Sequence, residues 1–220
     1  MPKNEETRRR ILEVALKLFA SSDFHKVNMR AVASVAEIGL STIYGYFESK
    51  ESLLTAVIDL SLDGFAKELE PDLAQLASAE GKLREIVRSS LNFMDSCPEL
   101  GSVLFLTVPL RVWAGRDFFR RQDRTYRLLA DVVTDGQRAG EIRSEVSPIT
   151  VFDTIFGLVA RQVVVSTLRG DKRPVAEYAD TISDIVCRAF LAQAPMSGPV
   201  RRALDEALRV GVSPQTTRQA

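Results

Sequence analysis

The chain has 220 residues, of which 45% are hydrophobic, and its 29 basic side chains balance 29 acidic ones. This composition excludes a disordered chain, and the zero net charge means that any binding to nucleic acid must depend on a local basic patch. Two cysteines, Cys97 and Cys187, are too few for a disulfide framework, and a single histidine excludes a histidine cluster around a metal. The first six residues lack the apolar run of a secretory signal, so a cytoplasmic protein is expected.

The first predicted helix has an apolar face at the spacing i, i+4, i+7, i+8. That face consists of Ile11, Ala15, Leu18 and Phe19. The helix is expected to end between residues 21 and 23. Three consecutive arginines, residues 8–10, stand near its start. A solvated helix start and a contact with phosphate both suit these charges, so their role stays open.

A second and a third short helix are expected directly afterwards. Asn28 is a candidate N-cap, because its side-chain oxygen can accept the free amide protons of a first turn. Gly39 interrupts the apolar pattern, which residues 40–46 resume. In this last segment small and hydroxyl side chains occupy one side, while Ile43 anchors the other. Helix, tight turn and helix in fewer than about twenty residues predict a helix-turn-helix, whose second helix enters the major groove of DNA.

The remaining chain is also helical in pattern. Further helices are expected over residues 49–70, 80–96, 99–113, 118–137, 149–168 and 174–193. Pro71 is expected to end the first of these, and Pro109 to kink the third, because proline removes a backbone donor and clashes with the preceding turn. Ser147 followed by Pro148 is an N-cap before proline, and Gly170 closes that helix. Since no sustained alternation predicts strands, the fold class is all-α.

We expect two domains and a tail. Residues 1–50 form an N-terminal three-helix DNA-binding domain of the helix-turn-helix type. A linking helix over 49–70 leads into a C-terminal helical domain, residues 51–195, for ligand binding and dimerisation. Residues 196–220 are rich in Gly, Pro, Arg, Gln and Thr, which predicts a loosely attached tail.

The apolar run from 148 to 168 is close in length to a membrane span of about 20 residues. It carries Asp153, Arg161 and Gln162 near its middle, and hydrocarbon tolerates such charges poorly. A buried interface helix is therefore expected, and no membrane partner.

The helices over 118–137 and 149–168 are the predicted interface of a homodimer. The second is apolar around much of its circumference, so one core-facing side cannot bury all of its apolar residues. Gly157 and Ala160 are small enough to allow a close approach of helices.

Four segments carry a family resemblance. In order they are ILEVALKLF at 11–19, MRAVA at 29–33, TIYGYF at 42–47 and SKESLL at 49–54. Together they resemble the TetR family of bacterial transcriptional regulators, over roughly residues 5–60. The segment from 136 to 143 also resembles the turn that joins two late helices in many members.

The resemblance implies which residues contact double-stranded DNA. The candidates are Asn28, Arg30, Leu40, Ser41, Thr42, Tyr44, Gly45, Tyr46 and Lys50. Asn28 would cap the second helix near a phosphate, and Lys50 would contact a phosphate. Tyr44 and Tyr46 lie about 200° apart on a helix, so at least one should be exposed.

Three departures from the family pattern concern this same region. The residues from 37 to 39 are Glu, Ile and Gly, where members usually have glycine, a small apolar residue and serine. Leu40 stands where a basic residue is frequent, and Gly45 where arginine is very frequent. Gly45 also weakens a helix by roughly 1 kcal/mol relative to alanine. The operator sequence is therefore not specified by these residues.

Aromatic and polar residues of the C-terminal helices are candidates for an effector pocket. They are Phe93, Phe105, Thr107, Arg111, Trp113, Tyr126, Phe152, Phe156, Gln162 and Tyr178. Ordinary core packing explains the aromatic residues equally well, and a buried ion pair or surface exposure explains the polar ones. By resemblance, a small-molecule inducer in such a pocket would change the spacing of two DNA-reading heads.

The sequence thus predicts a homodimeric, ligand-responsive regulator without enzymatic activity or cofactor, which binds an operator and is released from it by a small molecule. Repression rather than activation follows from the resemblance alone. Two alternatives remain open. One is a dimeric interaction protein with weakened DNA binding, suggested by Leu40 and Gly45. The other is a small helical enzyme or carrier, for which no cleft with a titratable pair is visible in the sequence.

Overall fold

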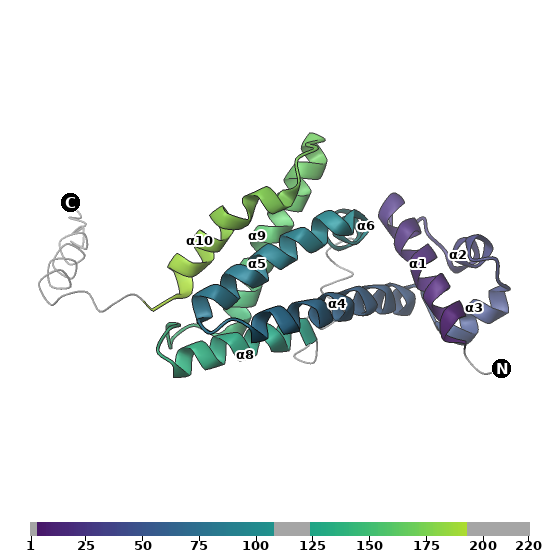
Figure 1. The fold of residues 1–220 in the computed structure, drawn as a ribbon. Coiled ribbons are helices and arrows are strands. Elements are labelled where there is room, and N and C mark those ends of the chain that lie inside the picture. Colours follow the sequence, from purple (N-terminus) through teal and green to yellow (C-terminus); the bar gives the residue numbers. More distant parts are fainter. Residues whose placement is uncertain (1–3, 108–123, 193–220) are drawn as a thin grey trace, which may run out of the picture.

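The structure is a computed structural model that describes residues 4–107 and 124–192 (Figure 1). Its helices are α1 Glu5–Ser21, α2 Met29–Val35, α3 Leu40–Tyr46, α4 Lys50–Ala74, α5 Ala79–Ser96, α6 Pro98–Ser102, the π-helix η1 Val103–Thr107, α8 Arg124–Arg138, α9 Pro148–Arg169, the 3₁₀-helix η2 Val175–Tyr178 and α10 Ala179–Phe190. In the described ranges the one extended pairing is an isolated bridge between Ile142 and Leu191. The predicted all-α fold is confirmed.

A small head of α1, α2 and α3 lies at one end of the molecule, and α4 runs from it into a larger bundle of α5, α8, α9 and α10 (Figure 1). The buried residues of α4 belong to different packing regions along its length. Its first half buries Leu53, Leu54, Val57 and Ile58, and its second half buries Phe65, Leu69 and Leu73. The helix packs against α1 of the head and against α5 and α8 of the bundle, so it belongs to both halves.

Helix ends follow the predicted capping residues. The Asn28 side chain accepts a hydrogen bond from the backbone N–H of Ala31 at 2.9 Å, which caps α2. The Ser147 side chain likewise accepts from the N–H of Thr150, with Pro148 at the first position of α9. Gly170 ends α9 in the left-handed conformation, at φ 63°. These ends are determined locally, because one side chain or one glycine satisfies the free backbone groups.

The expected end of the linking helix at Pro71 is wrong. Helix α4 continues to Ala74 with Pro71 inside it. Proline costs the helix one hydrogen bond at this position, but its ring lies on the exposed side. The next turn is retained because Leu73 is buried in the bundle, with 5% of its surface exposed.

The helix predicted over 99–113 is also more complex than expected. Its described part begins as α6 and widens at Val103 into η1, which extends to Thr107. Pro109 and the kink predicted there lie outside the described residues. Short π-helical stretches are uncommon and are frequent at functional sites.

The last helix, predicted as one element over 174–193, is divided. The Asp95 carboxylate accepts the backbone N–H groups of Val175 at 2.9 Å and Ala176 at 2.8 Å, so the segment begins as the separate 3₁₀ turn η2. Helix α10 then ends at Phe190. Ile185 of this helix is 48% exposed.

Both cysteines carry free thiols, half-buried at Cys97 and buried at Cys187. Removal of each thiol from water raises its pKa above the ordinary value. Because the thiolate is the reactive form, the raised pKa lowers the reactivity of both thiols.

Gly136 is required by a close approach of α8 to its neighbours. A Cβ atom there would lie 2.8 Å from Cδ1 of Ile142 and 3.0 Å from Cβ of Ala79, and Ile142 is buried. We expect Gly136→Ala to lower the free energy of unfolding by about 1–3 kcal/mol, because overpacking outweighs the better helix propensity of alanine. Urea unfolding followed by circular dichroism measures the change. Unchanged or increased stability would contradict the prediction.

Candidate functional site

Helix α3 is anchored by one side and presents the other to solvent. Ile43 is fully buried and Phe47, which follows the helix, is 5% exposed. Successive helix residues are rotated by about 100°, so Ser41 and Gly45 lie at the middle of the opposite face. Tyr44, 51% exposed, flanks them on one side and Thr42 on the other. The outward face therefore has small residues at its centre and larger polar side chains at its borders, which suits insertion into a groove.

The turn that sets α3 against α2 contains a strained residue. Glu37 has φ 53°, the left-handed region, in which a side chain costs about 1–2 kcal/mol. The backbone N–H of Ile38 donates to the carbonyl of Ala33 at 3.0 Å and closes the turn. Glu37 is the first of the three positions that depart from the family pattern, so this chain tolerates a strain that the usual glycine avoids.

Tyr46 has a structural role at the end of α3. It is half-buried, and its hydroxyl accepts from the backbone N–H of Asn4 at 2.8 Å and donates to the carbonyl of the same residue at 3.2 Å. The reading helix is thereby tied to the start of α1. Of the two predicted tyrosines, Tyr44 is the one exposed beside the centre of the face.

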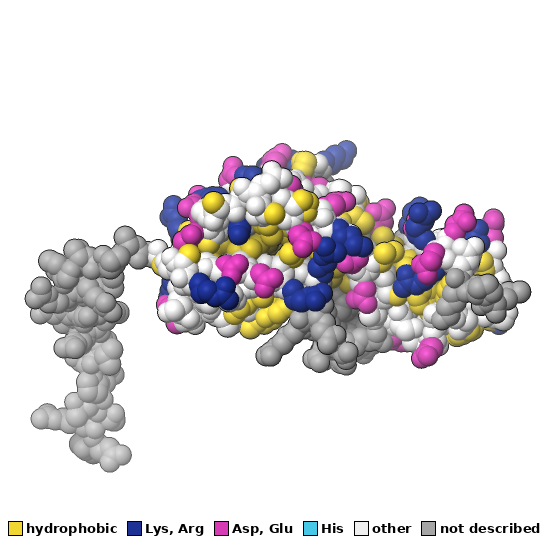
Figure 2. Space-filling view, turned by 60° about the horizontal axis from the view of Figure 1, so that its bottom comes forward, with side chains coloured by type: hydrophobic (Ala, Val, Ile, Leu, Met, Phe, Trp, Pro, Cys, Tyr) yellow, Lys and Arg dark blue, Asp and Glu magenta, His cyan; other side chains and the backbone are white. Residues whose placement is uncertain are grey.

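The basic residues near α3 are held by internal contacts to different degrees. The Lys50 ammonium donates to the carbonyl of Phe24 at 2.7 Å and lies 4.3 Å from the centre of its ring. An ammonium has three donors, so others remain for a phosphate. Arg8 lies over the ring of Phe47, at 5.9 Å, and Arg30 is exposed on the first turn of α2. Basic and acidic side chains are interspersed over the face of the molecule in Figure 2.

Gly45 leaves an open position at the centre of the face. A Cβ atom there meets no other atom within 4 Å. We expect Gly45→Ala to raise the free energy of unfolding by up to about 1 kcal/mol, because alanine is the better helix former and nothing obstructs it. Urea unfolding midpoints measure the effect. Gly136→Ala is the matched control, because it is expected to lower the free energy of unfolding. A lower midpoint for Gly45→Ala would refute the expectation.

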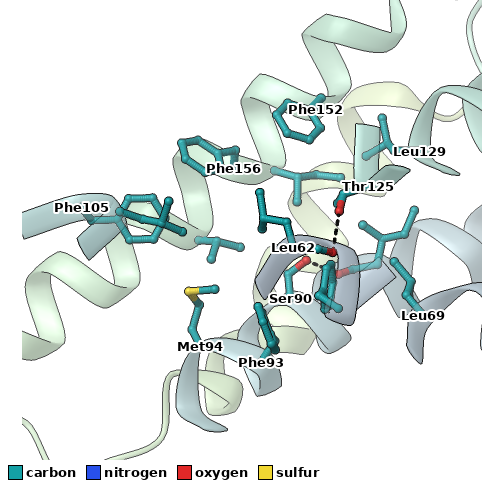
Figure 3. A pocket seen from close by; sticks show the side chains of 15 residues that line it. Leu62, Leu69, Ser90, Phe93, Met94, Phe105, Thr125, Leu129, Phe152 and Phe156 are labelled. Carbon is teal, nitrogen blue, oxygen red and sulfur yellow. Dashed lines mark hydrogen bonds between the residues drawn. The ribbon is translucent and has the colours of Figure 1, made fainter. Parts of the chain in front are cut away.

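An apolar cavity lies inside the bundle, bordered by α4, α5, η1, α8 and α9 (Figure 3). Its lining consists of Leu62, Phe65, Leu69, Ile86, Ser90, Phe93, Met94, Leu104, Phe105, Thr125, Leu129, Phe152, Ile155, Phe156 and Val159. The space between these residues measures about 760 Å³, including the part open to solvent. The part of it that a water-sized sphere can occupy is about 80 Å³, below the roughly 300–1,000 Å³ that is usual for small-molecule sites, so a ligand of ordinary size would have to widen the cavity.

The two hydroxyl groups of the lining already have partners. Ser90 donates to the carbonyl of Ile86 at 2.6 Å, and Thr125 donates to the carbonyl of Leu62 at 3.3 Å (Figure 3). The described wall is otherwise hydrocarbon, aromatic ring or thioether. A ligand part in this cavity is therefore selected by apolar contact and shape, and not by charge.

Four predicted ligand residues line the cavity: Phe93, Phe105, Phe152 and Phe156. The rings of Phe105 and Phe156 have centroids 5.2 Å apart, and those of Phe152 and Phe156 are stacked at 6.1 Å. Tyr126 stands edge-on to Phe152 at 5.6 Å, behind the lining. The other predicted residues are elsewhere. Thr107, Gln162 and Tyr178 are not in the described lining, and Arg111 and Trp113 lie outside the described residues.

Sequence reasoning missed the contribution of α4. Leu62, Phe65 and Leu69 stand in the apolar stripe of that helix, which was interpreted as a link between domains. Their periodicity was a usable signal for burial. It did not indicate that the buried side faces a cavity.

Thr107 connects η1 to the head. Its hydroxyl donates to the carbonyl of Phe19, in the last turn of α1, at 2.7 Å, and its own carbonyl accepts from the N–H of Phe24 at 3.4 Å. Ser102 adds a second bond to α1, to the carbonyl of Ala20 at 3.2 Å. Since Phe105 of the same short helix lines the cavity, one segment contacts both the cavity and the head.

An ionic cluster joins α4 to α8 beside the cavity. Arg124 pairs with Glu70 and lies 3.7 Å from Asp63. Lys67, 2.6 Å from Asp63, is the main cause of a lowered pKa of that carboxyl, and Arg124 adds to it. Exposed pairs of this kind contribute little stability each.

Comparison with known proteins relates these sites to a family. Residues 11–57 match the family described as "Bacterial regulatory proteins, tetR family". The fatty acid metabolism regulator protein of Bacillus subtilis is 21% identical over 177 residues, which cover 80% of this chain and 91% of that protein. The HTH-type transcriptional regulator UidR of Escherichia coli K12 is 39% identical over 54 residues, 24% of this chain and 28% of UidR.

A solved structure shares the fold over most of the chain. The crystal structure of the transcriptional regulator FadR from Bacillus subtilis in complex with stearoyl-CoA superposes with a TM-score of 0.71 at 20% identity, and the match covers 81% of this chain and 97% of that one. The segment matched by the family contains the capped helix α2 and the exposed face of α3. The head of the chain therefore matches the TetR family of bacterial regulatory proteins over residues 11–57, and the fold of most of the chain is similar to that of FadR.

Proposed function

We propose that the chain is a homodimeric repressor that binds a near-palindromic operator through α3 and is released by a small apolar ligand. The observation that carries the DNA part is the geometry of α3, whose exposed face stands on the buried anchor Ile43. Thr42 and Tyr44 reach the DNA from the borders of that face, and Ser41 reaches it from the centre. Asn28, Arg30 and Lys50 supply contacts to phosphate, which position the head without reading sequence.

The outward face of α3 carries no charged side chain, since its residues are Leu40, Ser41, Thr42, Tyr44 and Gly45. Hydroxyl groups bond to base edges or phosphates, and Leu40 suits contact with a thymine methyl group. Without a side chain at Gly45, the helix backbone can come closer to the base pairs than in relatives with arginine there. Tyr46, bonded to Asn4, acts by holding α3 in place.

The ligand part of the proposal rests on the cavity. Its described wall offers no charged group, so the bound portion should be a hydrocarbon chain or ring system. Stearoyl-CoA, which the FadR of Bacillus subtilis binds in its crystal structure, contains such a chain. We infer that a long-chain acyl compound is the first ligand to test, with its chain among the phenylalanines of α5, η1 and α9.

Ligand response would pass through η1. A chain against Phe105 displaces a helix whose far end holds Phe19 through the Thr107 hydroxyl. The ligand then favours an orientation of the head that fits the operator poorly. The size of this shift equals the difference in the ligand's affinity for the two orientations of the head. We infer a cytoplasmic location, because the proposed operator DNA lies in that compartment.

The dimer surface should involve α9 and α10 rather than α8. In the described part of α8 the exposed residues are mostly polar: Arg127, Asp131, Thr134, Asp135, Arg138. By contrast, Leu168 of α9 is 76% exposed and Ile185 of α10 is 48% exposed. The prediction that paired 118–137 with 149–168 is therefore revised in one of its two helices.

Genomic fragment selection with the purified protein, followed by footprinting at two salt concentrations, tests this function. We expect a protected near-palindrome whose affinity falls steeply with salt, because phosphate contacts release counterions. Adding stearoyl-CoA should then remove the protection. Absence of any enriched fragment would refute the DNA-binding function, whereas protection that stearoyl-CoA leaves unchanged would refute the ligand class alone.

A further inference from the structure

Helix α9 has an outward face whose centre is Gly157. Its buried residues are Val151, Phe152, Ile155, Val159 and Val163. At about 100° per residue, these five surround one direction of the helix, and Gly157 points in the opposite direction. A Cβ atom at Gly157 meets nothing within 4 Å. Glycine weakens a helix interior, so its presence at an open central position suggests that another backbone approaches there.

Helix α9 also carries apolar residues outside its buried side, of which Ile149 and Leu168 are exposed. By length and composition, α9 is the helix of the described chain that could cross a membrane, and 28% of its most apolar 18-residue window is buried. Asp153 and Arg161 are exposed near the middle of the outward face, and charges at that depth are costly in hydrocarbon. A protein surface that supplies opposite charges is the better occupant.

The two charges are placed symmetrically. Asp153 lies four residues before Gly157, and Arg161 lies four residues after it. Neither has an ion-pair partner among residues 4–107 and 124–192, in contrast to Arg84, which pairs with Asp184 on α10. Eight residues separate them by about 12 Å along the axis, which is too far for a pair within one helix.

We propose that a second copy of the chain covers this face, with the two α9 helices antiparallel and crossing at Gly157. A two-fold axis at that residue places Asp153 of each subunit opposite Arg161 of the other, so two ion pairs form from charges that have no ion-pair partner among the described residues of one chain. The proposal rests on the homodimer proposed above and specifies its register.

Apolar residues border the two ion pairs. Ile149 and Val165 both lie eight residues from Gly157 and about 80° from it around the helix, so the axis brings them to the same level at the edges of the interface. Ile149 is 40% exposed in the single chain, and Val165 is partly exposed. An apolar surround excludes water from the two ion pairs, which strengthens them and makes a like-charge pair costly. The pattern is thus self-complementary in charge and in hydrophobicity.

Charge reversal tests the register. Asp153→Arg and Arg161→Asp, made singly, each place like charges opposite one another at two points, and we expect the dimer dissociation constant to rise at least about 30-fold. The double variant restores opposite charges in exchanged positions, and its dissociation constant should return to within about threefold of the wild type. Sedimentation velocity over a concentration series measures all of these, with circular dichroism to confirm folding.

Asp131→Arg, a charge reversal at another exposed position, on α8, is the matched control and should leave the dimer unchanged. Weakening by both single variants without recovery in the double variant would overturn the pairing of residues 153 and 161. Single variants with a wild-type dimer dissociation constant would also overturn this pairing. A wild-type chain that is monomeric at every concentration would instead contradict the homodimer of the proposed function, so the two failures are distinguishable.

Discussion

Alanine at both Thr42 and Tyr44 should lower affinity for the operator by about 30-fold to 10⁴-fold, since each contact to DNA is worth about 1–3 kcal/mol. Both side chains are exposed on α3, and neither contributes to the core that holds the helix. Fold and dimer should therefore be retained. Fluorescence anisotropy with the footprinted operator, at one fixed salt concentration, measures the change.

Thr134→Ala is the control for this experiment, because it removes an exposed hydroxyl from α8 in the opposite half of the molecule. It should bind the operator like the wild type. If the double variant also binds within threefold of the wild type, the exposed side of α3 does not read DNA. The alternative of a dimeric interaction protein would then be favoured.

Thr107→Val should separate ligand binding from release. Valine keeps the shape of threonine but cannot donate to the carbonyl of Phe19, so η1 loses a hydrogen bond to α1. Coupling between two sites is typically worth 5-fold to 150-fold in affinity. In the Thr107 variant we expect stearoyl-CoA to weaken operator binding by no more than about threefold. Operator affinity without ligand and the affinity for stearoyl-CoA should both change little.

Titrations of operator complexes with stearoyl-CoA measure this coupling, and calorimetry measures ligand binding directly. Thr134→Val is the matched control, because its hydroxyl bonds within α8 alone. Full release by the Thr107 variant would show that the signal reaches the head by another route, for example along α4. Loss of ligand binding itself would place Thr107 at the cavity.

Local chemistry explains which parts of the fold were predictable. Asn28, Ser147 and Gly170 mark helix ends through groups within four residues of themselves, and the structure confirms each of them. Pro71 was misleading because a contact distant in sequence, the burial of Leu73 in the bundle, outweighs its local effect. The widening of the chain into η1 has no local signal that we recognise.

The sites were predictable to different extents for the same reason. The exposed side of α3 follows from the position of Ile43 on one short helix. The cavity depends on where five helices leave space, and periodicity tells which side of a helix is inside without telling how well it is filled. The bond from Thr107 to Phe19 joins residues that are 88 positions apart, so only the folded chain reveals it.

The unbroken course of α4 has a consequence for exchanging parts between relatives. A head cut out at residue 50 would leave behind Leu53, Leu54, Val57 and Ile58, which fill its core. A chimaera that joins this head to another sensor should instead be spliced between Ile58 and Leu62, where buried contacts pass from the head to the cavity. The unit that can be transferred is thus a head together with two turns of the following helix.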